Sequence, residues 1–114
     1  MKLDRPYGQI SAWAGLVRLL CRWPRLRPVA MRMAARLEGG EIFSPTLRAI
    51  LQEHYGVHVG MHSYGACLDP GVMPPGTWVG NYCSLAVKMT VLRRNHPIDR
   101  ISLHSFFFNR ERAV

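Results

Sequence analysis

Cysteine is scarce in this sequence. The chain has three cysteines, and no two of them form a C-x-x-C pair. An odd number of widely spaced cysteines argues against a disulfide framework and against a zinc site, and it fits a reducing compartment. The three residues are Cys21, Cys67 and Cys83.

Acidic residues are nearly missing from the first third of the chain. Up to Arg36 the only acid is Asp4, while the same stretch holds eight lysines and arginines. From residue 37 onward seven lysines and arginines stand against six acids, so all but one unit of the net charge of +8 belongs to the N-terminal end. A basic end on a near-neutral body suggests anionic lipid or nucleic acid as a partner. The alternative is a solvated helix face with no partner.

A long apolar run is also lacking. Arg18 interrupts the apolar stretch 9–21, and the uninterrupted part is far shorter than the ~20 residues of a membrane-spanning helix. Lys2 and Arg5 precede this stretch as they would in a signal peptide, but no clear small-x-small cleavage site follows. Two hypotheses stay open: an interfacial helix that lies on a membrane, and a helix that packs on its own domain.

What the sequence does contain is enough apolar residue for one globular domain. Hydrophobic residues make up 48% of the 114 residues. Helical periodicity predicts helices over 10–22 and 28–38. A third helix is predicted after Ser44, a good N-cap, with Pro45 at the first helical position and Gly56 as the stop.

After Gly56 the pattern changes from helical spacing to a spacing of six. Val59-Gly60-Met61-His62-Ser63-Tyr64 matches Val79-Gly80-Asn81-Tyr82-Cys83-Ser84, and steps of six continue to Leu85 and Val91. An aliphatic residue at every sixth position is typical of a hexapeptide repeat, in which three short strands form one triangular coil of ~18 residues. We therefore expect Val59, Val79, Leu85 and Val91 to stack as a core. The alternative is an ordinary antiparallel sheet, whose strands alternate with period two.

The stretch from Val57 to Asn109 resembles the hexapeptide-repeat O-acetyltransferases of the xenobiotic (chloramphenicol and streptogramin) type and their sugar- and polysaccharide-modifying relatives. The segments that carry the resemblance are Val59-Gly60 with Ser63-Tyr64, Val79-Gly80-Asn81-Tyr82-Cys83-Ser84, Asn95-His96-Pro97-Ile98-Asp99, and Ser102-Leu103-His104-Ser105-Phe106-Phe107-Phe108-Asn109. The upstream segment from Glu38 to Arg48 also looks like one bacterial branch of that group.

This resemblance implies a mainly β fold: an incomplete left-handed parallel β-helix of hexapeptide repeats, preceded by two or three N-terminal α-helices. Residues 1–56 would form the basic helical region. Residues 57–114 would form the first coils of the β-helix, with an active-site loop at 93–109. The resemblance further implies a homotrimer, because the family's active sites lie between two subunits.

The implied activity is transfer of an acetyl group from acetyl-CoA to a hydroxyl of a sugar, a polysaccharide precursor or a small molecule. His96 matches the family's general base, and imidazole is largely neutral near pH 7 and ready to accept a proton. Asp99 would orient that histidine, although a turn residue is the alternative reading. Tyr64 matches a residue of the family's acceptor pocket. Asn95 is also assigned to acceptor binding, and the alternative role for Asn95 is to shape the active-site loop. No acetyl-CoA-binding residue is assigned.

A metal cofactor is not expected. His54, His58 and His62 are spaced by four, as metal ligands on a helix would be, but Gly56 and Gly60 break such a helix. Acetyl-CoA is therefore the only co-substrate that we predict.

The chain departs from the family in two ways. Val87-Lys88 replaces the proline and glycine or asparagine usual at one corner, and the family continues for several coils beyond the Phe-Phe-Phe-Asn segment. We therefore expect a piece of a longer protein or a truncated product, weakly active or inactive alone. The competing hypothesis is a non-enzymatic module that binds anionic membrane through its Arg-rich helices. The expected location is cytoplasmic, or peripheral at the inner membrane surface, and no nucleic-acid motif is evident.

Overall fold

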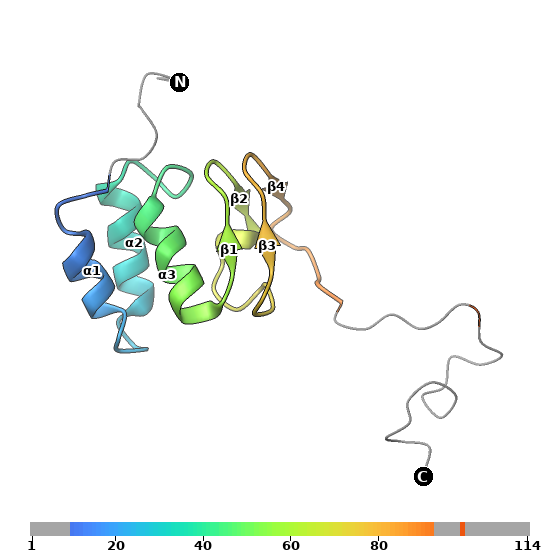
Figure 1. Ribbon diagram of the computed structural model, residues 1–114, viewed down its shortest axis with the longest axis horizontal. Helices are drawn as coiled ribbons and strands as arrows, with labels where there is room; N and C mark the ends of the chain where they lie inside the picture. The colour runs from blue at the N-terminus through green and yellow to red at the C-terminus, as the bar shows by residue number, and fades with distance from the viewer. Residues whose placement is uncertain (1–9, 93–98, 100–114) are drawn as a thin grey trace, which may run out of the picture.

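The computed structural model describes residues 10–92 and Asp99, and in this part of the chain helices precede strands (Figure 1). The helices are α1 (Ala14–Leu20), α2 (Arg27–Leu37) and α3 (Pro45–Tyr55). The strands are β1 (His58–Val59), β2 (Tyr64–Gly65), β3 (Trp78–Val79) and β4 (Ser84–Leu85), with a short 3-10 helix, η1 (Ala66–Leu68), after β2.

The caps of α3 explain where this helix begins and ends. The Ser44 hydroxyl accepts a hydrogen bond from the Leu47 N–H at 3.1 Å, and Pro45 occupies the first turn. Gly56 ends the helix in the left-handed conformation, with φ of 66°. The sequence prediction for this helix, from its N-cap to its stop, is confirmed.

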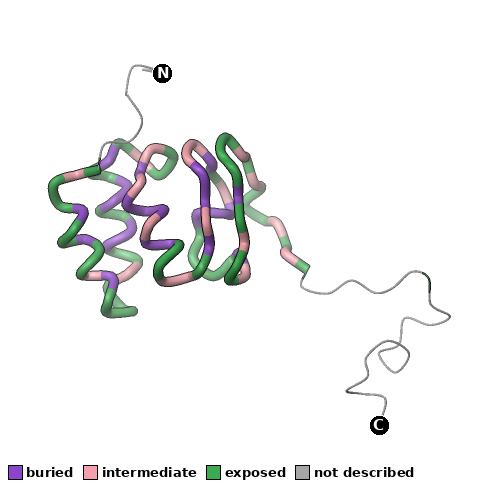
Figure 2. The backbone as a smooth tube through the Cα atoms, viewed as in Figure 1, coloured by how far each residue is buried: buried purple, intermediate pink, exposed green. Residues whose placement is uncertain are grey.

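The first helix, with 7 residues, covers about half of the range 10–22 that periodicity predicts, and the second lies one residue before its predicted range of 28–38. They pack against each other, and α2 also packs against α3. Small side chains on α2 allow this close approach, because Ala30, Ala34 and Ala35 are all buried. Figure 2 shows the result as buried and exposed positions alternating along both helices.

The strands pair in parallel, β1 with β3 and β2 with β4. The register places His58 opposite Trp78 and Tyr64 opposite Ser84, an offset of 20 residues in each pair. The two segments that share the repeat pattern are therefore neighbours in space, although they are 20 residues apart in the sequence (Figure 1). The alternative of an antiparallel sheet is wrong for these strands.

Polar groups join the two stacked segments between the strand pairs. The Ser63 hydroxyl, which is fully buried, donates to the Gly80 carbonyl at 2.6 Å and accepts from the Cys83 N–H at 2.9 Å. The Asn81 side-chain oxygen accepts from the Met61 N–H at 2.9 Å. Side chains thus extend the backbone pairing around the corner between the strands.

The predicted fold class, a mainly β left-handed parallel β-helix, is wrong. About 38% of the described residues are helical and 10% are in strands, and no left-handed β-helix is evident among them. The strands are two residues long and form two separate two-stranded sheets. One physical reason is that only one repeat segment stacks on another within 10–92, while η1 occupies a stretch where a triangular coil needs a further strand.

The core explains why helices dominate. Buried apolar side chains of the helices and strands form one cluster, and α3 lies between α2 and β1. The largest fully buried aliphatic side chains are Ile50 and Leu51 of α3 and Val17 of α1. Burial of each contributes roughly 1.5–3 kcal/mol. Of the four predicted core residues, Val59 and Val79 are buried, while Leu85 and Val91 are partly buried against the same cluster.

Candidate functional site

Two of the four predicted site residues, Tyr64 and Asp99, lie in the described part of the chain. Tyr64 belongs to β2 and its side chain is about half exposed, at 48%. Asp99 lies in an exposed turn. Asn95 and His96 lie outside the described residues, so their predicted roles stay predictions.

Two histidines stack on aromatic rings in a ladder that follows the strand register. His58 lies on Trp78, with ring centroids 3.6 Å apart and planes 15° apart. His62 lies on Tyr82 at 4.9 Å and 19°, and the Phe43 ring meets His62 edge-on at 5.7 Å. His62 and Tyr82 both have positive φ, 62° and 57°, which non-glycine residues rarely adopt. His62 and Tyr82 thus stack on each other from matching turns, after β1 and after β3, and both have an unusual backbone conformation.

This ladder does not form a metal centre. Among the described residues, His54 lies on α3 and has no ring contact with the stack, whereas His58 lies on β1 and His62 in the corner that follows it. Within 10–92, and at Asp99, no three His, Cys, Asp or Glu side chains are grouped so that they would hold a metal ion.

Arg48 is the most highly bonded side chain of the described residues. It lies on α3 and is only 7% exposed. Its guanidinium donates five hydrogen bonds of 2.8–3.0 Å to backbone carbonyls. The acceptors are the carbonyls of Glu41, Ile42, Ser44, Gly60 and Ser63. Since a guanidinium has five N–H donors, every donor is used, and none is left to hold a substrate.

Burial lowers the pKa of Arg48, because removal from water disfavours the charged form. Sequence reasoning missed this residue as a structural centre. The available signal is its place beside Leu47 and Leu51 on the apolar side of a helix, where an arginine needs internal partners.

Glu38 is a second buried polar centre, at the end of α2. Its carboxylate accepts from the Ser44 and Thr46 hydroxyls and from the backbone N–H groups of Thr46 and Ser11, both at 3.0 Å. Burial raises the pKa of Glu38, but these hydrogen bonds outweigh burial, so its pKa is lowered overall. Glu38 thereby ties the segment before α1 to the start of α3.

The lowered pKa of Glu38 predicts a stability that depends on pH. Because the folded-state pKa lies below the unfolded value of about 4.3, the contribution is full above that value and is lost as pH falls through the folded pKa. Glu38→Gln should therefore lower the free energy of unfolding by about 1–3 kcal/mol at pH 7. This deficit should shrink in acid. Urea unfolding at several pH values measures it, with Glu41→Gln, at an exposed position, as the control.

A deficit of the same size at pH 7 and in strong acid would contradict this prediction. It would mean that the Glu38 side chain acts through its shape and not through its charge.

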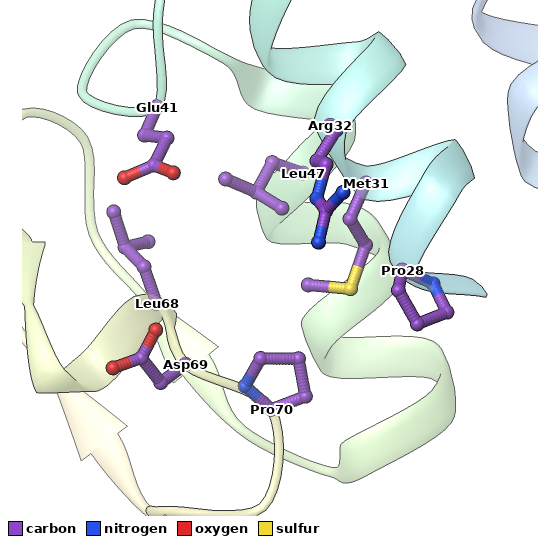
Figure 3. Close-up of a pocket in the computed structure, with 8 residues that line it drawn as sticks. All are labelled: Pro28, Met31, Arg32, Glu41, Leu47, Leu68, Asp69 and Pro70. Atoms are coloured by element: carbon purple, nitrogen blue, oxygen red, sulfur yellow. The ribbon is translucent and has the colours of Figure 1, made fainter.

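A pocket of about 230 Å³ lies where α2, α3 and the segment after η1 meet (Figure 3). Figure 3 shows Leu47, Met31 and Leu68 forming its apolar walls, with the charged groups of Arg32 and Asp69 on opposite sides. This volume is below the roughly 300–1,000 Å³ of most ligand pockets. The pocket therefore suits a small group at most.

A larger, open pocket of about 330 Å³ lies between α3 and β1 and includes Arg48, His58 and Asn81 in its lining. Arg48 has its donors occupied by carbonyls, His58 stacks on Trp78, and Asn81 accepts from a backbone N–H. These contacts explain structure and do not assemble an acid, a base and a nucleophile in one place.

Two of the three cysteines are poorly suited to act as nucleophiles. Cys21 and Cys67 are fully buried, and burial raises the pKa of both thiols, which disfavours the reactive thiolate. Cys83 is half-buried, and its sulfur lies 3.6 Å from the Asn81 carbonyl.

None of the helices in 10–92 has the length and hydropathy that crossing a bilayer requires. Comparison of the chain with protein-family models, with curated proteins and with solved structures found no match.

Proposed function

We propose that this chain belongs to an O-acetyltransferase that transfers acetyl from acetyl-CoA to a hydroxyl of a sugar, a polysaccharide precursor or a small molecule. The observation that carries the proposal is the order and spacing of the motifs from Val57 to Asn109. What supports it in the described residues is the parallel register, which pairs the repeated segments 59–64 and 79–84 with their predicted offset. The site as proposed lies between subunits of a homotrimer.

In this proposal His96 is the general base. Its neutral imidazole takes the proton from the acceptor hydroxyl while that oxygen attacks the thioester carbonyl. The new C–O bond forms, the C–S bond breaks, and the imidazolium returns the proton to the leaving thiolate of CoA. Asp99 would hold the second ring nitrogen, and Tyr64 and Asn95 would contact the acceptor. No covalent acyl-enzyme is required.

The test is turnover of acetyl-CoA by the full chain with a panel of hydroxyl acceptors, with the acetylated product detected by mass spectrometry. We expect weak turnover with one class of acceptor. His96→Ala should reduce it by at least about 100-fold, the lower end of general-base contributions. His54→Ala, on α3, is the matched control and should leave it unchanged.

Two results would contradict the proposal. Turnover that is undiminished in His96→Ala would exclude His96 as the base. Absence of turnover with every acceptor class would exclude the activity for this chain.

A further inference from the structure

The hairpin of α1 and α2 carries large apolar side chains on its solvent side. Trp13 and Trp23 flank α1 and are 60% and 56% exposed. The other exposed apolar residues of this hairpin are Leu16, Leu19, Leu26, Val29, Met33 and Leu37. We call these eight residues the helical apolar face.

Helical spacing makes this face two continuous stripes. On α2, Val29, Met33 and Leu37 follow one another at steps of four and therefore lie along one line. The buried residues Ala30 and Ala34 lie beside that line, toward the core.

On α1, Leu16 and Leu19 are three residues apart and form the equivalent exposed line, and Trp23 follows in the turn after the helix. The buried residues Val17 and Cys21 lie on the other side of the helix, in the core cluster. Each helix therefore has two apolar sides, of which only one is used to fold the domain.

The charge around this face has one sign. Residues 10–37 contain six arginines and no aspartate or glutamate. Arg18 forms an ion pair with Glu53 of α3, and Arg27 is half-buried with its guanidinium 5.9 Å from the centre of the Tyr55 ring. The other four, which are exposed and have no hydrogen-bond or ion-pair partner among the described residues, are Arg22, Arg25, Arg32 and Arg36.

We infer that the helical apolar face docks on the surface of an anionic phospholipid bilayer. The apolar side chains enter the boundary between headgroups and acyl chains, where Trp13 and Trp23 are suited to an interface that is apolar on one side and wet on the other. The arginines reach the anionic headgroups while their alkyl stems stay against apolar surface. This inference is independent of the proposed acetyl transfer.

Other occupants fit the face less well. A nucleic acid would satisfy the arginines but would leave Leu16, Leu19 and Val29 in water, because phosphates offer no apolar partner. A second copy would bring two arginine-rich surfaces together, which is unfavourable in a symmetric dimer. The segment 93–114 of the same chain carries a net charge of +3 and is a poor match for a basic surface.

The experiment uses the full chain with vesicles of phosphatidylcholine alone and of phosphatidylcholine with phosphatidylglycerol. We expect sedimentation with the anionic vesicles only, and weaker sedimentation at high salt, because screening reduces electrostatic attraction. In a Trp78→Phe background, Trp13 and Trp23 should report docking by a blue shift of their fluorescence. Trp78 is 74% exposed on β3, away from the face, so its removal should not alter binding.

Paired variants separate charge from apolar contact. The triple variant R22Q/R25Q/R36Q should bind anionic vesicles about 100-fold more weakly, at about fivefold per arginine. The charge-conserving R22K/R25K/R36K should bind within a few-fold of the unchanged chain. W13S/W23S should lose on the order of tenfold, whereas the matched surface variant W78S should lose nothing.

Several outcomes would overturn the inference. Equal binding to neutral and anionic vesicles, or no binding to either, excludes an anionic bilayer as the occupant. Equal losses in W13S/W23S and W78S exclude this face as the docking surface. Tighter binding to duplex DNA than to anionic vesicles assigns the arginines to nucleic acid, and a dimer in light scattering that W13S/W23S abolishes assigns the face to a second copy.

Discussion

Replacement of Arg48 by methionine should lower the free energy of unfolding by about 3–5 kcal/mol, as expected when one partner of a buried charged network is removed. The methionine fills similar apolar space but offers none of the five N–H donors that Arg48 supplies to carbonyls. Each carbonyl left buried without a donor costs about 1–3 kcal/mol before relaxation. Urea unfolding followed by circular dichroism measures the loss.

Two further substitutions test whether stability depends on the donor geometry of the Arg48 guanidinium, one at Arg48 itself and one at an exposed arginine as the control. Arg48→Lys keeps the charge but has three donors on a compact ammonium, so its loss should be smaller than that of Arg48→Met but still clear. Arg25→Met, at an exposed position, should change stability by no more than about 0.5 kcal/mol. An Arg48→Met chain within 1 kcal/mol of the unchanged protein would contradict the role given to the guanidinium.

Gly65→Ala should destabilise the chain by at least about 3 kcal/mol, because two separate costs add at this position. Gly65 has φ of 94° and ψ of −144°, a conformation that costs a residue with a Cβ about 1–3 kcal/mol. A Cβ built there would also lie 1.8 Å from the carbonyl oxygen of Leu85, its partner in the β2–β4 pair. That oxygen belongs to the backbone, so β2 and β4 must move apart.

Two other glycines separate these costs. Gly76 has φ of 87° but open space around a built Cβ, so Gly76→Ala should cost only the strain, about 1–2 kcal/mol. Gly15 lies inside α1 with open space, so Gly15→Ala should stabilise the chain by about 0.5–1 kcal/mol. Thermal and urea unfolding of the three variants should give this order. A Gly65→Ala chain no less stable than Gly76→Ala would contradict the close β2–β4 approach.

The elements that the sequence predicted correctly depend on local chemistry. The start and stop of α3 follow from Ser44, Pro45 and Gly56, which act on backbone groups within five residues of themselves. The 20-residue register follows from matching segments, because equivalent side chains prefer equivalent surroundings when two stretches stack.

The fold class was wrong because a repeat pattern does not state how many of its turns stack. Val59 and Val79 are buried as expected, but Leu85 and Val91 are only partly covered. The helices α1 to α3 supply seven of the fifteen buried residues of the core cluster, whereas the strands supply two. The pattern after Gly56 corresponds to one pair of stacked segments in the described residues, whereas the prediction took it as evidence for successive coils of a β-helix.

The buried polar centres were not predictable for a different reason. Arg48 bonds to carbonyls, which every residue carries, so no residue type marks the partners in the sequence. Glu38 is held by Ser44 and Thr46, whose hydroxyls are equally common in exposed loops. The predicted catalytic residue His96 lies outside the described residues, so the structure does not test it.

Three of the five acceptors of Arg48 come from the chain before α3, and two come from the chain after it. The same helix also places Leu51 in the cluster shared by the helices and strands. Cleavage of the chain at Gly56 would leave two fragments. Each would hold some of the carbonyls that accept from Arg48 and would expose its share of the core cluster to water. The helices therefore do not form an independent module to which the strands are appended. Both parts depend on the hydrogen bonds that the Arg48 guanidinium donates to carbonyls before and after α3.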